Sequence, residues 1–324
     1  MLYVENKYGP SISVVDTKDY KVVGTISLGK DTIPDDVIVS NDGKTLYANV
    51  AYGTSHGNPD AQAEVSDLIA FSTQSEKEIW RARIKGNIGH MAISPDNRYI
   101  YNTLFDRWYV AQVDTKTHEV EDIPVDFIGG HGIRVSANGK RLYVGSILMP
   151  EIDVVDLQKK KVIQRVRFRD AVRPFGITKD EKTAYVQLSW LHGFEVVDLK
   201  KNRVSMTVHL PKLPADTPEE KVWNTVDHGL EITHDETHIV TVATTGNYAA
   251  VHRLPSLELV GIVPVGKEPS WVIVSDDGTL AFVSSRKSDE VSVISIPDAK
   301  EVKRVKVGRH PQRMWFSETA KRAA

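Results

Sequence analysis

Short hydrophobic strands and polar turns recur along this chain at a nearly constant interval. Each unit contains an apolar strand, a Ser-x-Asp-Gly-like turn and a second strand rich in Tyr and Val. The repeated turn residues are 54, 42, 42, 55 and 42 positions apart; they are Asp42, Asp96, Asn138, Asp180, Asp235 and Asp277. A period near 42 that is made of short strands is typical of β-propeller blades.

Each unit is predicted to form four antiparallel strands. In one unit, the inner strand spans His131 to Ser136, a tight Asn-Gly turn follows, and the second strand spans Arg141 to Ser146. The third strand carries a second repeated pattern, such as EIDVVD from Glu151. The outer strand, such as VIQRVRF from Val162, alternates charged and aliphatic residues, as expected when one side faces water.

The seventh unit is divided between the two ends of the chain. MWFSETA from Met314 begins a unit, and LYVEN from Leu2 supplies its second strand. Pairing these strands would close the ring and remove an open sheet edge. The pattern therefore predicts an all-β, seven-bladed β-propeller of four-stranded antiparallel blades, with N- and C-terminal strands combined in one blade. We expect one domain over residues 1–324.

Two insertions account for the two long intervals. One runs from Ala51 to Glu64 between the second and third strands of its blade, and the other from Pro211 to Asp227 between an outer strand and the next inner strand. In an antiparallel blade both kinds of connection emerge on the same face. Long loops in a compact fold are often functional, so we expect these insertions to cover a site on that face.

Aligning the repeats identifies two rings of residues at the heads of the inner strands. Five positions before the repeated Ser or Thr stand Asp35, Gly89, His131, Arg173, His228, Ser270 and Gln312. The next position holds Asp36, His90, Gly132, Pro174, Gly229, Trp271 and Arg313. Both rings are predicted to surround the mouth of the central channel, where they bring His, Arg, Asp and Trp together.

We predict catalytic roles for four of these residues. His131 and His228 occupy equivalent positions and could act as an acid/base pair, because imidazole transfers protons near neutral pH. Arg173 would bind a carboxylate, a phosphate or a developing oxyanion, and Asp35 would orient a histidine. The alternative is structural: the histidines would cap strands, and an Arg–Asp pair would only fix the blades.

A second group is predicted to bind substrate around the catalytic residues. It combines basic and aromatic side chains, as expected of a small-molecule cleft; the residues are Arg313, Trp271, His90, Tyr248, Trp190 and Arg286. For the aromatic residues the alternative is packing between blades. His90 stands one position after the ring of His131, so it could instead face a blade interface.

One divalent metal ion is a candidate cofactor. A metal needs three or more convergent ligands, and the candidates are His131, His228, His90 and His310. No local spacing such as His-Glu-x-x-His supports a metal site.

Composition limits the partners. The formal net charge is -2 and the sequence pI about 6.6, so there is no global electrostatic argument for nucleic acid. No apolar run reaches eighteen residues, so we expect no membrane span. Cysteine is absent, which excludes disulfides and thiolate chemistry. The compartment stays open: Met1 close to the first strand suits a cytoplasmic chain, and equally a periplasmic or secreted protein whose export signal was removed.

The motifs LYVEN, SISVVD, KVVGTISLG and ISPDNRYIY resemble those of the YVTN-type seven-bladed β-propellers. The resemblance covers essentially the whole chain and implies the fold. The wider group includes lactonases, antibiotic-opening lyases, heavy subunits of amine dehydrogenases, surface-layer proteins and DNA-associated propellers. These proteins share no catalytic motif, so the resemblance assigns no site residue.

Two functions are compatible with the sequence. The first is an enzyme of the lyase or hydrolase type that acts on a small polar or anionic molecule at the channel mouth. The second is a non-catalytic propeller that recognises a protein, a peptide or a nucleic-acid strand, or that serves in a redox assembly. Convergence discriminates them, because an enzyme needs its imidazoles within about 5 Å of a common point.

Overall fold

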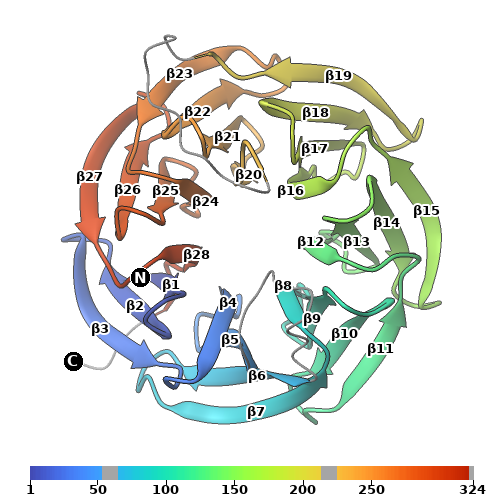
Figure 1. The fold of residues 1–324 in the computed structure, drawn as a ribbon, viewed down its shortest axis with the longest axis vertical. Coiled ribbons are helices and arrows are strands. Elements are labelled where there is room, and N and C mark those ends of the chain that lie inside the picture. The colour runs from blue at the N-terminus through green and yellow to red at the C-terminus, as the bar shows by residue number, and fades with distance from the viewer. Residues whose placement is uncertain (53–64, 213–224, 321–324) are drawn as a thin grey trace.

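The computed structural model describes residues 1–52, 65–212 and 225–320. Within these ranges, the regular elements are 28 strands in seven antiparallel four-stranded sheets. The sheets stand as blades around a central axis (Figure 1). The seven-bladed propeller predicted from the repeats is therefore confirmed. The described residues include no helix with the length and apolar character required to cross a membrane.

Six blades are formed by strands that are consecutive in the chain, with the first strand of each nearest the axis. The first three of these blades contain β4 (Thr32–Val39), β5 (Thr45–Tyr52), β6 (Val65–Ser72) and β7 (Glu78–Lys85); β8 (Ile88–Ile93), β9 (Tyr99–Leu104), β10 (Tyr109–Asp114) and β11 (Val120–Pro124); and β12 (Gly130–Val135), β13 (Arg141–Ser146), β14 (Glu151–Asp156) and β15 (Lys161–Arg167). The other three contain β16 (Val172–Ile177), β17 (Thr183–Leu188), β18 (Gly193–Asp198) and β19 (Arg203–His209); β20 (Leu230–Ile232), β21 (His238–Ala243), β22 (Tyr248–Arg253) and β23 (Leu259–Pro264); and β24 (Pro269–Val274), β25 (Leu280–Ser285), β26 (Glu290–Ser295) and β27 (Lys300–Lys306).

The remaining blade joins the two ends of the chain. Its strands, from the axis outward, are β28 (Pro311–Phe316), β1 (Leu2–Asn6), β2 (Ser11–Asp16) and β3 (Lys21–Ser27). In the β1–β28 pair, Leu2 lies opposite Phe316 and Val4 opposite Met314. The predicted closure of the ring by N- and C-terminal strands is therefore present.

The repeated polar turns have one hydrogen-bonding scheme. In the β8–β9 turn, the Ser94 hydroxyl donates to Asp96 over 2.6 Å and accepts from the backbone N–H of Tyr99 over 2.9 Å. Each such turn thereby satisfies its own polar groups locally. The same hydroxyl-to-side-chain bond recurs in the pairs Ser40–Asp42, Ser136–Asn138, Thr178–Asp180, Thr233–Asp235 and Ser275–Asp277.

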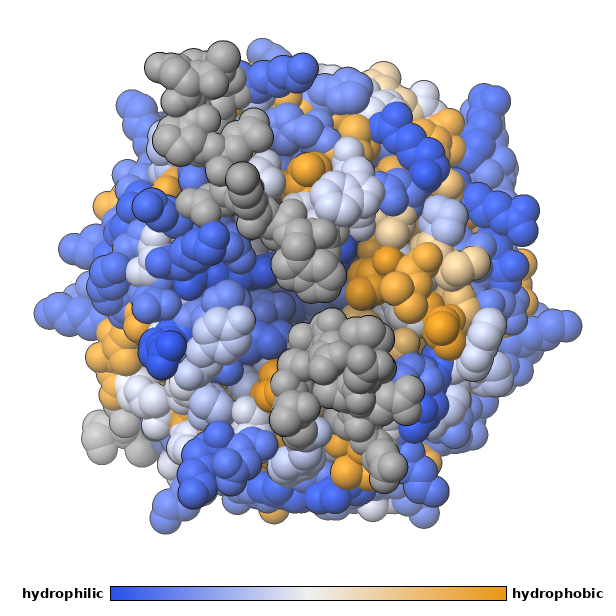
Figure 2. Space-filling model, in the orientation of Figure 1, coloured by the Kyte–Doolittle hydropathy of each residue, from blue (hydrophilic) through white to orange (hydrophobic). Residues whose placement is uncertain are grey.

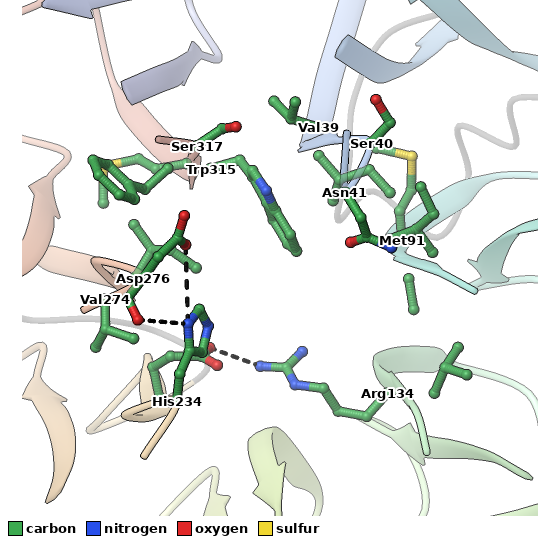
Figure 3. A pocket seen from close by; sticks show the side chains of 18 of the residues that line it. Val39, Ser40, Asn41, Met91, Arg134, His234, Val274, Asp276, Trp315 and Ser317 are labelled. Atoms are coloured by element: carbon green, nitrogen blue, oxygen red, sulfur yellow. Dashed lines mark hydrogen bonds and ion pairs between the residues drawn. The ribbon is translucent and has the colours of Figure 1, made fainter. Parts of the chain in front are cut away.

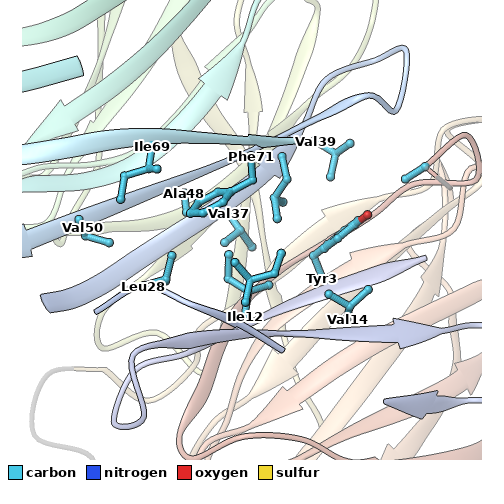
Figure 4. Packing of buried hydrophobic residues seen from close by; sticks show 13 residues of the cluster. Tyr3, Ile12, Val14, Leu28, Val37, Val39, Ala48, Val50, Ile69 and Phe71 are labelled. Atoms are coloured by element: carbon cyan, nitrogen blue, oxygen red, sulfur yellow. The ribbon is translucent and has the colours of Figure 1, made fainter. Parts of the chain in front are cut away.

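Apolar side chains fill the spaces between neighbouring blades. At the closing blade, Tyr3 and Ile12 pack against Val37 and Phe71 of the next blade (Figure 4). Packing across this boundary holds the two ends of the chain in the ring. The outer strands contribute less, and in β27 (Lys300–Lys306) only Val305 is buried.

Nearly every inner strand has a β-bulge at its head. In the β8–β9 pair, Ile88 lies opposite Leu104 but Met91 lies opposite Asn102, so β8 holds one extra residue between them. Similar register shifts occur at the heads of β4, β12, β16, β24 and β28. A bulge interrupts the two-residue alternation of side chains and redirects them. Apart from His228, which precedes β20, the predicted catalytic residues stand at these bulges.

Candidate active site on the propeller axis

Three histidines from three blades meet on the axis. The ring centroids of His90 and His131 are 3.8 Å apart, and those of His131 and His228 are 5.6 Å apart. Their exposed fractions are 2%, 6% and 4%. The alignment of repeats thus brings His131 and His228 together as expected. His90 joins them rather than a blade interface, because the bulge at the head of β8 breaks the alternation.

Trp271 and Arg313 form one wall of this imidazole cluster, defined here as His90, His131 and His228. The indole centroid lies 5.7 Å from that of His90 and 6.0 Å from that of His228. The Arg313 guanidinium lies over the indole, with Cζ 3.3 Å from the ring centroid, as in a cation–π contact.

Two further guanidinium groups lie beside the cluster, that of Arg173 buried and that of Arg286 14% exposed. Arg173 Nε donates to the Ser189 hydroxyl over 2.8 Å. Arg286 donates to the Ser270 hydroxyl, and its Nη1 lies 3.5 Å from a Glu268 oxygen. Burial, together with the like charge of Arg286, lowers the pKa of Arg173 to about 10. Arginine stays protonated in proteins, so both groups favour a nearby anion.

The imidazoles are held in their neutral form. Burial, reinforced by the nearby arginines, lowers the pKa of His131 and of His228 well below 6.5. His228 Nδ1 lies 2.8 Å from the carbonyl oxygen of Ser270. Because a carbonyl only accepts, Nδ1 carries the hydrogen and Nε2 keeps its lone pair. His228 is therefore fixed in the tautomer that a general base requires.

Carboxyl groups complete the site from the closing blade and its neighbour. Asp35 forms an ion pair with Lys7 over 3.2 Å, and Asp36 lies 3.6 Å from an Arg313 nitrogen. Burial raises the pKa of Asp36 to about 6 and that of Glu5 to about 8. Glu5 is thus mostly protonated at pH 7 and offsets little of the positive charge of the arginines.

Residues of the second strands position the cluster, and the sequence prediction did not include them. Thr103 accepts from the backbone N–H of His90 over 2.8 Å and lies 3.1 Å from the carbonyl oxygen of His131, so it links two inner strands. Asn49 also links two inner strands: its side-chain oxygen accepts from the backbone N–H of Asp36 over 2.7 Å, and its side-chain nitrogen donates to the carbonyl oxygen of Gly89. The signal was available, because one repeat position carries the polar residues Glu5, Asn49, Thr103, Gln187 and Ser284.

Three residues predicted for this site lie elsewhere. Tyr248 is buried, and its hydroxyl donates to the carbonyl of Pro211 over 2.6 Å, away from the imidazole cluster. Trp190 lies on the surface in the β17–β18 connection and is 60% exposed. The His310 ring lies beside that of Tyr8, with the centroids 4.2 Å apart and the planes tilted by 30°. The two insertions fall largely outside the described residues.

A divalent cation does not fit the imidazole cluster. Within residues 1–52, 65–212 and 225–320, no three His, Cys, Asp or Glu side chains are placed to share a metal ion. The charges that lower the pKa of His131 come from Arg173 and Arg313, and these cations would repel a metal. His228 Nδ1 is also engaged by the Ser270 carbonyl.

The face that carries the connections from second to third strands is hollowed at its centre, and hydrophilic residues border the hollow (Figure 2). An apolar patch lies to one side of the hollow, near the inner ends of β12–β14. Leu148 and Met149, which connect β13 and β14, are 58% and 44% exposed. The site therefore combines a polar centre with an apolar patch on one side.

Glu5 provides a stability test of this electrostatic description. The pKa of the Glu5 carboxyl is about 8 in the folded protein and near 4.5 in the unfolded chain, so folding favours its protonated form. Its contribution to the free energy of unfolding is therefore complete below pH 4.5 and is lost as the pH rises to 8. Gln keeps the acceptor for the backbone N–H of Arg313, which lies 3.3 Å from Glu5, and never ionises. Glu5→Gln should therefore melt several degrees above wild type at about pH 9 and close to it at about pH 4.5.

Glu78 supplies the control for that experiment. It lies on an outer strand, and hydrogen bonds from Arg81 lower the pKa of its carboxyl. Glu78→Gln should therefore give no gain in melting temperature at alkaline pH. An equal gain in both variants, measured by differential scanning calorimetry, would contradict a protonated Glu5.

Comparison with known proteins agrees with the fold. Residues 220–322 match the model of the YNCE-like β-propeller family, and no curated protein matches the sequence. Solved structures that resemble the chain include a periplasmic gluconolactonase of Pseudomonas aeruginosa, with TM-score 0.75, 19% identity and coverage of 97% of this chain and 98% of the other. A putative 6-phosphogluconolactonase of Bacteroides fragilis matches with TM-score 0.73 and 14% identity, and the match covers 98% of this chain and 97% of the other.

A third similar structure is hydrazine synthase of Kuenenia stuttgartiensis, with TM-score 0.71, 16% identity and coverage of 89% of this chain and 90% of the other. At these identities the likeness concerns the fold. Together with the ring of seven blades, the comparisons identify the chain as a protein of the β-propeller class.

Proposed function

We propose that this protein is a hydrolase that opens a small anionic lactone at the imidazole cluster. The observation that carries the proposal is the placement of three neutral imidazoles within 3.8 and 5.6 Å of one another beside buried guanidinium groups. This convergence favours an enzyme over a recognition surface, on which the same side chains would be spread around an open rim.

In this proposal His228 is the general base. Its Nε2 lone pair takes a proton from water, and the hydroxide attacks the lactone carbonyl. The carbonyl C–O bond within the ring then breaks, and the ring oxygen leaves with the proton carried by the imidazolium. The product is a hydroxy acid, so that one lactone and one water are consumed for each product.

Arg173 and Arg286 have the second role. They stabilise the oxyanion that forms on the carbonyl oxygen, because preformed buried cations act strongly where water is excluded. They then hold the carboxylate of the product. The His131 ring, whose centroid lies 5.6 Å from that of His228, can share the proton with it. These roles extend the predicted functions of His131, His228 and Arg173.

The similar structures support a lactone as substrate. Two of them are named as a gluconolactonase and a putative 6-phosphogluconolactonase. Both names describe hydrolysis of a cyclic ester of a sugar acid. A cyclic ester that also carries an anionic group would suit the positive charge beside the imidazole cluster.

A pH-stat assay tests the proposal. Glucono-δ-lactone, 6-phosphogluconolactone and a homoserine lactone are offered at near-neutral pH, and acid release is compared with spontaneous opening. We expect acceleration for the phosphorylated lactone above all and a loss of about 100-fold in kcat/KM for Arg173→Met. Acceleration that Arg173→Met leaves unchanged would contradict the role of the guanidinium.

The product distinguishes the other hypotheses. An unsaturated acid, detected by its absorbance, would indicate a lyase. Binding of 6-phosphogluconate without acceleration of any lactone would favour a recognition protein.

A further inference from the structure

A second cavity lies on the axis at the opposite end of the channel, where the first and second strands of each blade connect. Its volume is about 590 Å³, which is in the range of small-molecule sites. Figure 3 looks into it with the ribbon colours running in the opposite sense to Figure 1, and therefore from the other face. None of the three cluster histidines lines it.

One repeat position supplies most of the inner wall. Two positions before the repeated Ser or Thr, the inner strands carry Ile38, Ala92, Arg134, Gly176, Glu231, Ile273 and Trp315, and all except Gly176 line the cavity. The Arg134 guanidinium reaches the Glu231 carboxylate over 3.0 Å, and the Trp315 indole also points into the cavity (Figure 3). The wall thus combines an aromatic surface with a partly exposed cation.

Arg313 forms part of the wall shared with the imidazole cluster. It lines the cavity, is 3% exposed, and its Nε has no hydrogen-bond partner in the described part of the chain. A buried donor without a partner is costly. Because an N–H can only donate, a ligand that satisfies it must present an acceptor.

The charges of the lining favour an anionic acceptor. Burial raises the pKa of Asp36 to about 6 and that of Glu231 above its usual value, so each carboxyl is protonated more readily than a free one. Arg134 and Arg313 contribute guanidinium groups, which are cationic in proteins. The rest of the lining mixes apolar side chains such as Met91 with polar ones, so an apolar body of the ligand can lie against the apolar part; the ionisable residues among the polar ones are Lys179, His234 and Asp276.

We propose that this cavity binds a small carboxylate with an apolar body, such as an aryl acid or a branched aliphatic acid. The carboxylate meets the guanidinium groups of Arg134 and Arg313, and the apolar body lies against Trp315 and Met91. This site is separate from the imidazole cluster and does not depend on the lactonase proposal, since it uses the other face of the Trp271–Arg313 wall.

Isothermal titration calorimetry with benzoate tests the site. We expect a Kd of about 0.1 mM for wild type and at least tenfold weaker binding of benzyl alcohol, which lacks the charge. The double variant Arg134→Gln/Glu231→Gln removes the cation without leaving an unpaired carboxylate, and it should weaken the binding of benzoate at least tenfold. Arg173→Met, at the other end of the channel, should leave its affinity within about twofold.

Three results would overturn the proposal. They are no heat with benzoate up to about 10 mM, tighter binding of benzylamine than of benzoate, and loss of benzoate binding in Arg173→Met but not in the double variant. If the double variant does not fold, nuclear Overhauser contacts in wild type decide between the sites. Contacts from the benzoate ring to the Trp315 indole support the cavity, and their absence at saturation contradicts it.

Discussion

Deletion of Met1 to Val4 is expected to lower the melting temperature of the whole ring by more than about 10 °C, or to prevent folding. Leu2, Tyr3 and Val4 are 2%, 1% and 0% exposed. Burying such side chains contributes about 1.5–3 kcal/mol each, so their joint loss approaches the total stability of a domain, about 5–15 kcal/mol.

Topology makes this deletion worse than the loss of an edge strand. β1 lies between β28 and β2, so its removal leaves β28 without its neighbour in the blade and exposes the edge of β2. β28 carries Arg313, and the wall of the imidazole cluster would therefore be lost with it.

Circular dichroism melts of three variants measure the effect. Val4→Ala removes two buried methyl groups, so its melting temperature should lie between those of the deletion variant and wild type. Val302→Ala on outer strand β27, where the side chain is 54% exposed, should melt within about 2 °C of wild type. A deletion variant with the melting temperature of wild type would show that the N-terminal strand of the closing blade does not stabilise the ring.

The fold could be predicted from sequence because the turns and strands are specified locally. In each turn, Ser or Thr at the first position and Asp or Asn two residues later satisfy one another, as Ser94 and Asp96 do. That chemistry fixes the register of both flanking strands, and the spacing then counts the blades. Nothing beyond the repeat was needed to pair Leu2 with the C-terminal strand.

The site was predictable as far as pseudo-symmetry determines it. His131 and His228 lie together because equivalent positions in a ring share one radius and one height. Arg173 and Arg313 are buried at the axis for the same reason. The same reasoning would have placed Arg134 beside Glu231, since they also occupy equivalent positions two blades apart.

What the repeat does not encode is the direction of a side chain at a bulge or in a loop. His90 faces the axis because β8 gains an extra residue at its head. Tyr248 begins a strand near the same face, yet its hydroxyl turns to Pro211. The high pKa of Glu5 is likewise invisible in the motif LYVEN, because it follows from complete burial in the assembled ring.

His228→Asn should reduce kcat/KM for the lactone by about 100- to 10,000-fold while leaving the melting temperature within a few degrees of wild type. The Asn amide can still donate to the Ser270 carbonyl, which His228 Nδ1 contacts at 2.8 Å, but it has no lone pair in place of Nε2. His131→Asn should also reduce kcat/KM for the lactone. His252→Asn is the control, since His252 is buried, with a lowered pKa, in the β22 strand outside the cluster.

The pH profile separates a proton-transfer role from a structural one. A general base must be unprotonated, and the pKa of His228 lies well below 6.5. The kcat/KM of wild type should therefore stay level as the pH falls through 6.5 and decline only in more acidic solution. In His228→Asn the residual activity should lose that decline. Because burial and the arginines hold the imidazole neutral, a wild-type midpoint at or above 6.5, or a His228→Asn variant within threefold of wild type, would remove His228 from the reaction.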